Sequence, residues 1–543
     1  AAGLIAGAVL ALTPVASLMF RFNNPDALLV LLLIVAAYCT VRATETASTR
    51  WIALASCAVG FAFLTKSGQA LLPVPALGLA YLVAAPVSRR RRVVQLVAAL
   101  AAMVVAAGWW IAAVVLWPAA GRPYIGGSTD NNPLELAFGY NGLSRLFGGQ
   151  GNAGGGGGRG GGGGANTGFG GATGLARLFR GEFGLEISWL LPAALLLLGV
   201  GVWLTWGRGR TDRVRAAMIV WGGWLLVTAA TFSYMKGTIH PYYTVALAPA
   251  IAALVGIGGV LLWERRRDLG RVAYAALAVV VLVTCAWDVK LLRSEPSFHP
   301  WVADVALVTG ALALLALVVA AVRLRARGRI ALVAGLGTAL ALGVPVGAWG
   351  LATAGTPHSG SIPAAVAGTG SGGFGNGGQP SGGGTRPTGG APGGQTSGRP
   401  PSGLHGRSAG GTRGGLGGGV PGGGGGTPGG GAGASKAIVA ALEKTTTRWA
   451  AATDGSQSAA SLELASGGKA VMAIGGFTGS DPAPTLAQFK AYVAAGDITY
   501  YIAGGGMGGG PGGGGSASQI TSWVEAHFKS VKIGGQTVYV LHK

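Results

Sequence analysis

Eleven mostly apolar segments occupy the first 350 residues of the chain. Crossing the hydrocarbon core of a membrane takes a helix of about 20 such residues, because only internal hydrogen bonds can satisfy the backbone there. The third and fourth segments are short and separated only by Lys66, Ser67 and Gly68, so they could form one kinked hairpin. The pattern predicts an all-α polytopic membrane core over residues 1–350. The segments cover residues 3–20, 26–41, 51–65, 68–86, 93–117, 187–206, 215–233, 241–263, 271–287, 301–322 and 330–350.

Basic residues alternate between the two sets of loops that join these segments. One set carries eighteen arginines and the opposite set of short loops carries five cations. Cytoplasmic loops hold the excess of Lys and Arg, so the arginine-rich set is predicted to be cytoplasmic. The opposite loops, including the long loop 118–186, and everything after residue 350 are then predicted to be extracytoplasmic. This places the protein in the plasma membrane as a multi-pass protein.

The part of the chain after the last apolar segment changes composition twice. Residues 351–434 are mostly Gly, Pro, Ser and Thr, which predicts a disordered linker, and the glycine run 148–174 in the long loop is expected to be disordered too. From residue 435 onward, predicted helices (436–452, 485–494, 518–528) alternate with predicted strands (470–474, 498–502, 538–541). Such alternation favours a small α/β domain over residues 435–543.

Composition and spacing exclude several other classes of function. The net charge of +22 would suit nucleic acid, but the cations are dispersed among helix ends, where they attract anionic lipid headgroups. No nucleic-acid partner is therefore expected. Cys39, Cys57 and Cys285 lie within apolar stretches and follow no disulfide or zinc spacing. The sequence requires no cofactor and indicates no metal site, although a requirement for a divalent metal stays open.

Polar side chains at the predicted outer helix ends are the candidate ligands of a functional site, because charged and amide groups beside hydrocarbon are expensive. They are Arg21, Asn23, Asn24, Asp26, Lys66, Gln69, Lys236, His240, Tyr242 and Tyr243. Acidic residues of the long loop are expected to be solvated charges or helix caps; these are Asp130, Glu135, Glu182 and Glu186.

Each group of candidates also has a simpler interpretation. Asn24, Pro25 and Asp26 could serve only to start a helix. Lys66 lies on the side that the charge pattern leaves poor in cations, so it either binds a phosphate or extends along the membrane surface into water. The stretch from Lys236 to Tyr243 either anchors the chain as an aromatic belt or binds a polar headgroup or sugar.

Five stretches of the sequence resemble the bacterial family 39 glycosyltransferases, which include protein O-mannosyltransferases and lipid A aminoarabinose transferases. They read RFNNPDALLVLLLIVAAY, FLTKSGQALLPVPALGLAYLVAAP, RPYIGGSTDNNPLELAFGYNGLSRLFG, ISWLLPAALL and GTIHPYYTVALAPAIAALVGIG. A sixth, from RWAAATDGSQ to YYIAGGG, resembles the extra C-terminal extracytoplasmic domain of actinobacterial and firmicute mannosyltransferase-like members.

The resemblance implies a GT-C fold and the transfer of a sugar from a polyprenyl-phosphate donor to an extracytoplasmic acceptor. Mannose is the sugar it suggests, and Lys66, assisted by Arg21 or Lys236, is the expected phosphate ligand. The family's catalytic Asp belongs to the first extracytoplasmic loop, and no residue here matches the acid pair it often forms. Because the chain opens without Met in an apolar run, we expect that Asp upstream of Ala1.

Two rival functions share the same topology. A transporter or flippase of lipid-linked intermediates would use the same polar helix ends, but such proteins often carry internal repeats and broken helices at mid-membrane, which the sequence does not display. A structural surface protein could use the glycine-rich tail for contacts in the cell envelope, but it would not need a lysine and a His-Tyr-Tyr cluster at membrane edges.

Overall fold

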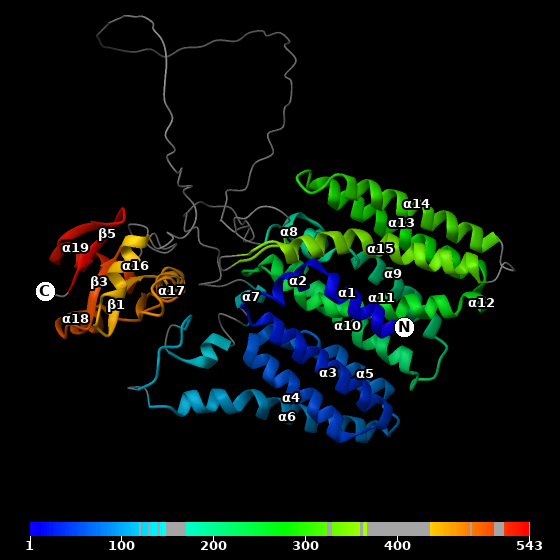
Figure 1. Ribbon diagram of the computed structural model, residues 1–543. Coiled ribbons are helices and arrows are strands. Elements are labelled where there is room, and N and C mark those ends of the chain that lie inside the picture. Colours follow the sequence, from blue (N-terminus) through cyan, green and yellow to red (C-terminus); the bar gives the residue numbers. More distant parts are fainter. Residues whose placement is uncertain are drawn as a thin grey trace, which may run out of the picture. The chain divides into compact units, whose positions relative to one another are not determined.

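The computed structural model describes eleven stretches of the chain (Figure 1). They are residues 1–118, 121–128, 131–137, 142, 144–147, 170–322, 328–358, 362–365, 435–477, 481–503 and 515–541. Most of the predicted glycine-rich loop and nearly all of the predicted linker lie outside these residues, as does Asp130.

Eight helices in the described residues are long and apolar enough to cross a membrane. A ninth span is formed if the helices α8 (Gly181–Ile187) and α9 (Leu191–Thr205), which meet at 59°, are taken together. The eight are α3 (Asp26–Thr46), α4 with η1 (Thr49–Leu71), α6 (Arg89–Leu116), α10 (Arg213–Tyr234), η4 with α11 (Pro241–Glu264), α13 (Arg271–Ser294), α14 (Trp301–Val322) and α15 (Arg329–Gly355).

Two of the eleven predicted spans are shorter than expected. Segment 3–20 is divided into α1 (Ala2–Leu12) and α2 (Pro14–Met19), because Pro14 forces the preceding Thr13 into an extended conformation. Segment 68–86 contains only the 11-residue α5 (Val74–Ala84) after the 3-10 turn η1 (Ser67–Leu71). Proline again stands at the start of the helix, where its missing N–H is tolerated.

Tryptophan side chains and close helix contacts hold the membrane core together. Trp189, Trp224 and Trp349 are fully buried. The indole of Trp224 donates to Ala246 O at 2.9 Å and that of Trp349 donates to Ala365 O at 2.7 Å. The second bond ties residues 362–365 to α15, which itself extends five residues beyond the predicted end of the core. Buried indoles need such partners in hydrocarbon.

Three of the predicted arginine-rich loops meet at one end of the helix bundle. Arg213 Nε lies 3.5 Å from Glu45 Oε1, and Arg210 donates to Ala85 O at 2.8 Å, although the three loops are far apart in sequence. For these three loops, the predicted cytoplasmic side corresponds to one of the two ends of the bundle. Short helices at or near these ends are α7 (Ser144–Phe147), η3 (Leu175–Phe179) and α12 (Arg266–Leu269).

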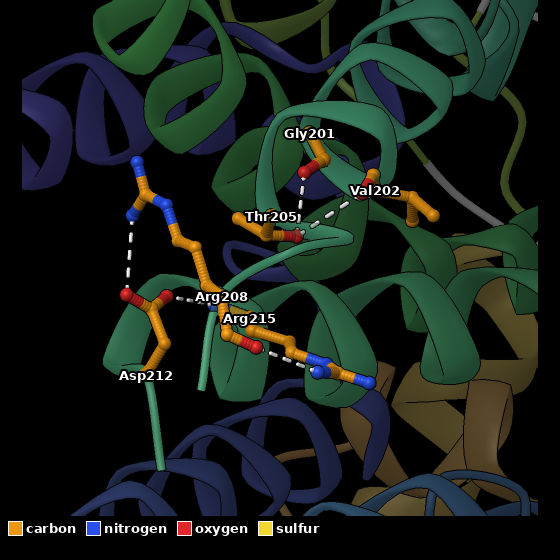
Figure 2. Close-up of polar contacts among 6 residues, drawn as sticks. All are labelled: Gly201, Val202, Thr205, Arg208, Asp212 and Arg215. Carbon is orange, nitrogen blue, oxygen red and sulfur yellow. Dashed lines mark hydrogen bonds and ion pairs between the residues drawn. The ribbon is translucent and has the colours of Figure 1, made fainter. Parts of the chain in front are cut away.

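Figure 2 shows how one of these basic loops is folded between α9 and α10. Asp212 caps α10 by accepting from Arg215 N at 2.8 Å, and its other oxygen pairs with Arg208 Nη1 at 3.2 Å. Arg215 returns a bond to Arg208 O at 3.0 Å. One carboxylate thus satisfies the helix start and neutralises one of the clustered arginines.

The C-terminal domain is a five-stranded mixed sheet covered by helices on both faces. The strand order is β2-β1-β3-β5-β4, with β1 parallel to both neighbours and β5 antiparallel to β3 and β4. Helices α16 and α17 pack on one face, and α18 and α19 pack on the other. The elements are α16 (Lys436–Glu443), β1 (Trp449–Asp454), α17 (Ser456–Ala465), β2 (Val471–Ile474), α18 (Leu486–Ala494), β3 (Ile498–Ile502), α19 (Ser516–His527), β4 (Ser530–Ile533) and β5 (Gln536–Val540).

The α/β class of this domain is as predicted, but the expected helix over residues 436–452 is wrong in its second half. Helix α16 ends at Glu443, and the alanines after Trp449 belong to the interior strand β1. Ala450, Ala451 and Ala452 are at most 2% exposed, since they are enclosed by β2, β3 and the covering helices. Burial between two strands outweighs the helix propensity of alanine here.

Candidate functional site

A buried ion pair stands at the end of the bundle opposite the arginine-rich loops. Lys66 Nζ lies 2.5 Å from Asp26 Oδ2, and the Asp26 side chain is fully buried. Asp26 opens α3, where Asn24 Oδ1 accepts from its backbone N at 3.1 Å. Lys66 closes α4, because Ser67 adopts a positive φ of 38° and turns the chain back. Two helix ends 40 residues apart in sequence are therefore joined through their charges.

Aromatic rings enclose the ammonium group of Lys66. Its Nζ lies 4.0 Å from the ring centroid of Tyr243 and 5.1 Å from that of Tyr242, within cation–π range. The two tyrosines meet edge to face at 4.9 Å, and the imidazole of His240 stacks on Tyr242 at 5.7 Å. All three rings come from the start of η4 (Pro241–Leu247), which is inserted among the helices. The charge of Lys66 is thus shielded from water on the side of η4.

Arg145 brings a second cation into the same cluster. Its guanidinium donates a hydrogen bond to the Tyr243 hydroxyl and lies 5.7 Å from the centroid of that ring. Backbone bonds fix the loop, since Lys236 N donates to Leu146 O and Gly237 N donates to Arg145 O. Burial, followed by the positive charges of Arg145 and Lys66, lowers the pKa of His240 from 6.5 to about 4. The imidazole is therefore neutral at pH 7.

We call these side chains, together with Gln69, the Asp26–Lys66 cluster. Gln69 belongs to it because its Nε2 donates to Tyr243 O at 3.3 Å. Lys66 and Arg145 are the basic side chains of the cluster, and Asp26 is its carboxylate. Its members are Asp26, Lys66, Gln69, Arg145, His240, Tyr242 and Tyr243.

The structure separates the remaining sequence candidates from the cluster or places them at its edge. Asn24 adjoins it by accepting a hydrogen bond from Asp26 N at 3.1 Å. Asn23 is exposed, and Arg21 is exposed and donates to Ala354 O. Lys236 is exposed and contributes only its backbone N. Arg21 and Lys236, which the sequence suggested as partners of Lys66, are therefore not part of the cluster. Among the described residues, Arg145 is the cation that accompanies Lys66 there.

The sequence did not predict the positions of two residues, Arg145 and Glu186. Arg145 carries the same signal as Lys66, a cation on the side otherwise poor in positive charge. Glu186 was expected to be solvated or to cap a helix, but it is 1% exposed. Its Oε1 accepts from Ala365 N at 3.4 Å. Glu182 is exposed, in keeping with the expectation for it.

An apolar groove runs beside the ion pair on the outside of the bundle. It has a volume of about 540 Å³ and lies between α3 and α4. Pro25 and Thr65 at its lining immediately precede Asp26 and Lys66 in sequence. The lining residues are Pro25, Leu28, Leu32, Phe61, Leu64 and Thr65. An apolar surface thus adjoins the Asp26–Lys66 cluster.

Metal chemistry has no visible ligand set in the described parts of the chain. No three His, Cys, Asp or Glu side chains there come together as a possible metal site. Cys39 and Cys285 are buried and Cys57 is half-buried, and all three are free thiols.

Two family models match the chain. "Dolichyl-phosphate-mannose-protein mannosyltransferase" matches residues 1–115, and "Putative mannosyltransferase YkcB-like, C-terminal" matches residues 438–527. The crystal structure of ArnT from Cupriavidus metallidurans bound to undecaprenyl phosphate superposes with a TM-score of 0.43 at 15% identity. That superposition covers 99% of this chain and 79% of the other.

Two proteins of Bacillus subtilis (strain 168) are similar in sequence. "Putative mannosyltransferase YycA" is 28% identical over 54% of this chain and 53% of its own length, so the chain spans about half of that relative. "Putative mannosyltransferase YkcB" is 30% identical over 97% of this chain and 76% of its own length. With both its membrane core and its C-terminal domain matched, the chain belongs to the YkcB-like family of GT-C mannosyltransferase-like membrane proteins.

Proposed function

We propose that the protein is an integral-membrane glycosyltransferase that takes a hexose, with mannose as the first choice, from a polyprenyl-phosphate donor. The observation that carries the proposal is that two basic side chains, Lys66 and Arg145, come together in the Asp26–Lys66 cluster beside an apolar groove. A donor of this class has a charged phosphate head and a long apolar tail. The head is complementary to the cations of the cluster, and the tail is complementary to the apolar groove.

Lys66 and Arg145 give the cluster the kinds of side chain that bind a phosphate. Both cations lie against the ring of Tyr243, so the structure brings them to one aromatic residue. An ammonium and a guanidinium group donate charge-assisted hydrogen bonds to phosphate oxygens. A phosphate placed against Lys66 and Arg145 would accept such bonds from both.

These two cations would stabilise the charge that develops during the transfer reaction. The bond between the sugar carbon and the phosphate oxygen breaks, and the bonding electron pair stays on the phosphate, which gains negative charge. The acceptor hydroxyl forms the new bond to the sugar and loses its proton to a carboxylate base. Lys66 and Arg145 would stabilise the leaving phosphate. We propose no base among the described residues.

The same proposal sets the compartment and the partners. With the arginine-rich end in the cytoplasm of a plasma-membrane protein, the Asp26–Lys66 cluster and the C-terminal domain would face outward. The partners are then membrane lipids, the polyprenyl-phosphate-linked sugar and an extracytoplasmic acceptor, which could be a protein, a lipid or a cell-wall glycan.

Binding of a short-chain polyprenyl phosphate to the full chain in nanodiscs tests the head-group assignment. Arg145→Gln removes one cation and leaves the ion pair intact, so the affinity should fall about 10-fold or more, the equivalent of one charge-assisted hydrogen bond of ~1.5–3 kcal/mol. Asp26→Asn removes the competing carboxylate, so the affinity should rise. Lys236→Gln, at an exposed cation outside the cluster, is the matched control and should change nothing.

The uncharged polyprenol of the same length distinguishes binding through the phosphate head from binding through the apolar tail. It should bind weakly and respond to none of the three variants. Equal affinities for alcohol and phosphate, or a phosphate affinity that ignores both Arg145→Gln and Asp26→Asn, would overturn the assignment. Formation of a glycosylated product from radiolabelled polyprenyl-phosphate mannose then separates a transferase from a flippase, which would move the lipid unchanged.

A further inference from the structure

The edge of the C-terminal sheet where its three parallel strands end carries a second group of polar and aromatic side chains. Strands β1, β2 and β3 run parallel and finish at Asp454, Ile474 and Ile502. The segment after β1 leads into α17 on one face of the sheet, and the chain after β3 reaches α19 on the opposite face. The connection that leaves β1 and the connection that leaves β3 therefore run to opposite faces of the sheet. Open α/β sheets bind their ligands at such a switch point.

Asp454 supplies an acceptor at this switch point. The Tyr501 hydroxyl lies 3.2 and 3.3 Å from its two oxygens, and Thr521 Oγ1 lies 3.3 Å from one of them. Hydroxyl bonds to a carboxylate normally measure 2.5–2.7 Å. Tyr501 and Thr521 are instead close to each other, at 2.6 Å. The half-buried carboxylate thus keeps capacity for further and shorter hydrogen bonds from a ligand.

An exposed aromatic ring stands at the same edge. Phe477 follows the end of β2 and is 60% exposed. The turn that carries it contains Gly475 and Gly476 with φ of 75° and 65°, and Ser456 N at the start of α17 donates to Gly476 O at 2.8 Å. This bond joins the turn after β2 to the segment that follows Asp454. The glycine turn thus carries a large, exposed aromatic ring at the same sheet edge as Asp454.

The charge of the edge selects the class of ligand. The described residues that follow the three strands, and the first turns of α17 and α19, include no Lys or Arg. A phosphate would meet the carboxylate of Asp454 there, and that of Asp481 beside the turn after β2. A neutral molecule with several hydroxyls and an apolar face suits a carboxylate, two hydroxyl groups and an aromatic ring.

We propose that this edge of the C-terminal domain binds a neutral carbohydrate, with sugar hydroxyls donating to Asp454 and the face of the sugar ring lying on Phe477. The site is separate from the Asp26–Lys66 cluster and does not require transfer activity. It gives the domain the role of holding a glycan chain.

Binding of neutral manno-oligosaccharides to the full chain in nanodiscs, followed by saturation-transfer NMR and calorimetry, tests the proposal. The unmodified protein should bind with a millimolar or better Kd. Phe477→Ala removes the ring from an exposed position and should weaken binding about 10-fold, and Asp454→Asn should weaken it to a similar degree. Leu464→Ala is the matched control, since Leu464 is 85% exposed near the other end of α17, and it should bind as the unmodified protein does.

Three outcomes would overturn the proposal. One is the absence of saccharide binding up to tens of millimolar, and another is binding that survives both Phe477→Ala and Asp454→Asn. The third is a preference for a phosphate-bearing ligand such as a nucleoside diphosphate that Asp454→Asn strengthens. The melting temperature of Phe477→Ala should match that of the Leu464→Ala control, so that a loss of binding reports on the site rather than on folding.

Discussion

The two ends of the helix bundle use ion pairs in different ways. At the arginine-rich end, Arg208 and Asp212 pair at 3.2 Å with about a quarter of each side chain exposed. At the opposite end, Lys66 and Asp26 pair at 2.5 Å with Asp26 fully buried and aromatic rings around the ammonium group. The first pair fixes a helix start in contact with water. The second keeps charge away from water, where it is expensive unless a partner is present.

Breaking the buried pair should have the largest effect. Lys66→Met leaves the carboxylate of Asp26 buried without its counter-charge, so unfolding in detergent should become easier by about 3–5 kcal/mol. The double variant Asp26→Leu with Lys66→Met removes both charges and should recover most of the stability. Unfolding curves of the two variants check this. If Lys66→Met were as stable as the unmodified protein, the buried pair would contribute no more to stability than a surface pair does.

The pH dependence of stability sharpens the comparison at the cluster end. Burial lowers the pKa of His240 from 6.5 to about 4, so between these values the unfolded chain binds more protons than the folded one. Stability contributed by the neutral imidazole is complete above pH 6.5 and is lost as the pH falls toward 4. Melting curves from pH 7 to pH 4.5 should therefore fall more steeply for the unmodified protein than for His240→Gln. Parallel curves would contradict the assignment of a neutral buried imidazole.

The smallest effects belong to the arginine-rich end. Asp212→Ala removes the cap that accepts from Arg215 N, and it should lower stability by about 1 kcal/mol. Arg213→Ala removes only an exposed partner of Glu45, which Arg42 also contacts, and it should change stability by less than about 0.5 kcal/mol. Melting temperatures of the two variants measure the difference. Equal losses would mean that capping contributes nothing beyond the ion pair.

The membrane core could be predicted from sequence because hydrocarbon imposes a composition that any window of about 20 residues displays. The breaks within that pattern were harder to place. Pro14 divides a segment that reads as one span, and only the backbone geometry at Thr13 shows that a separate short helix follows. In the C-terminal domain, Ala450–Ala452 suit a helix locally, and their place between two strands depends on partners far away in sequence.

The site was predicted as separate groups of residues, and the structure supplies their connections. Asp26 and Lys66 were both candidates, but nothing local indicates that they pair with each other. Arg145 lies in a loop whose path depends on backbone bonds to residues 236 and 237, so its approach to Tyr243 is a product of the fold. Arg21 and Lys236 carry the right charge at the right end, yet they are exposed.

The groove between α3 and α4 lies on the outer surface of the bundle, with Leu28 and Phe61 about half exposed. A lipid that enters it sideways never leaves the bilayer, so its supply is governed by its mole fraction among the surrounding lipids. Diluting the vesicles at constant lipid composition would then leave occupancy unchanged, while adding inert phospholipid would lower it.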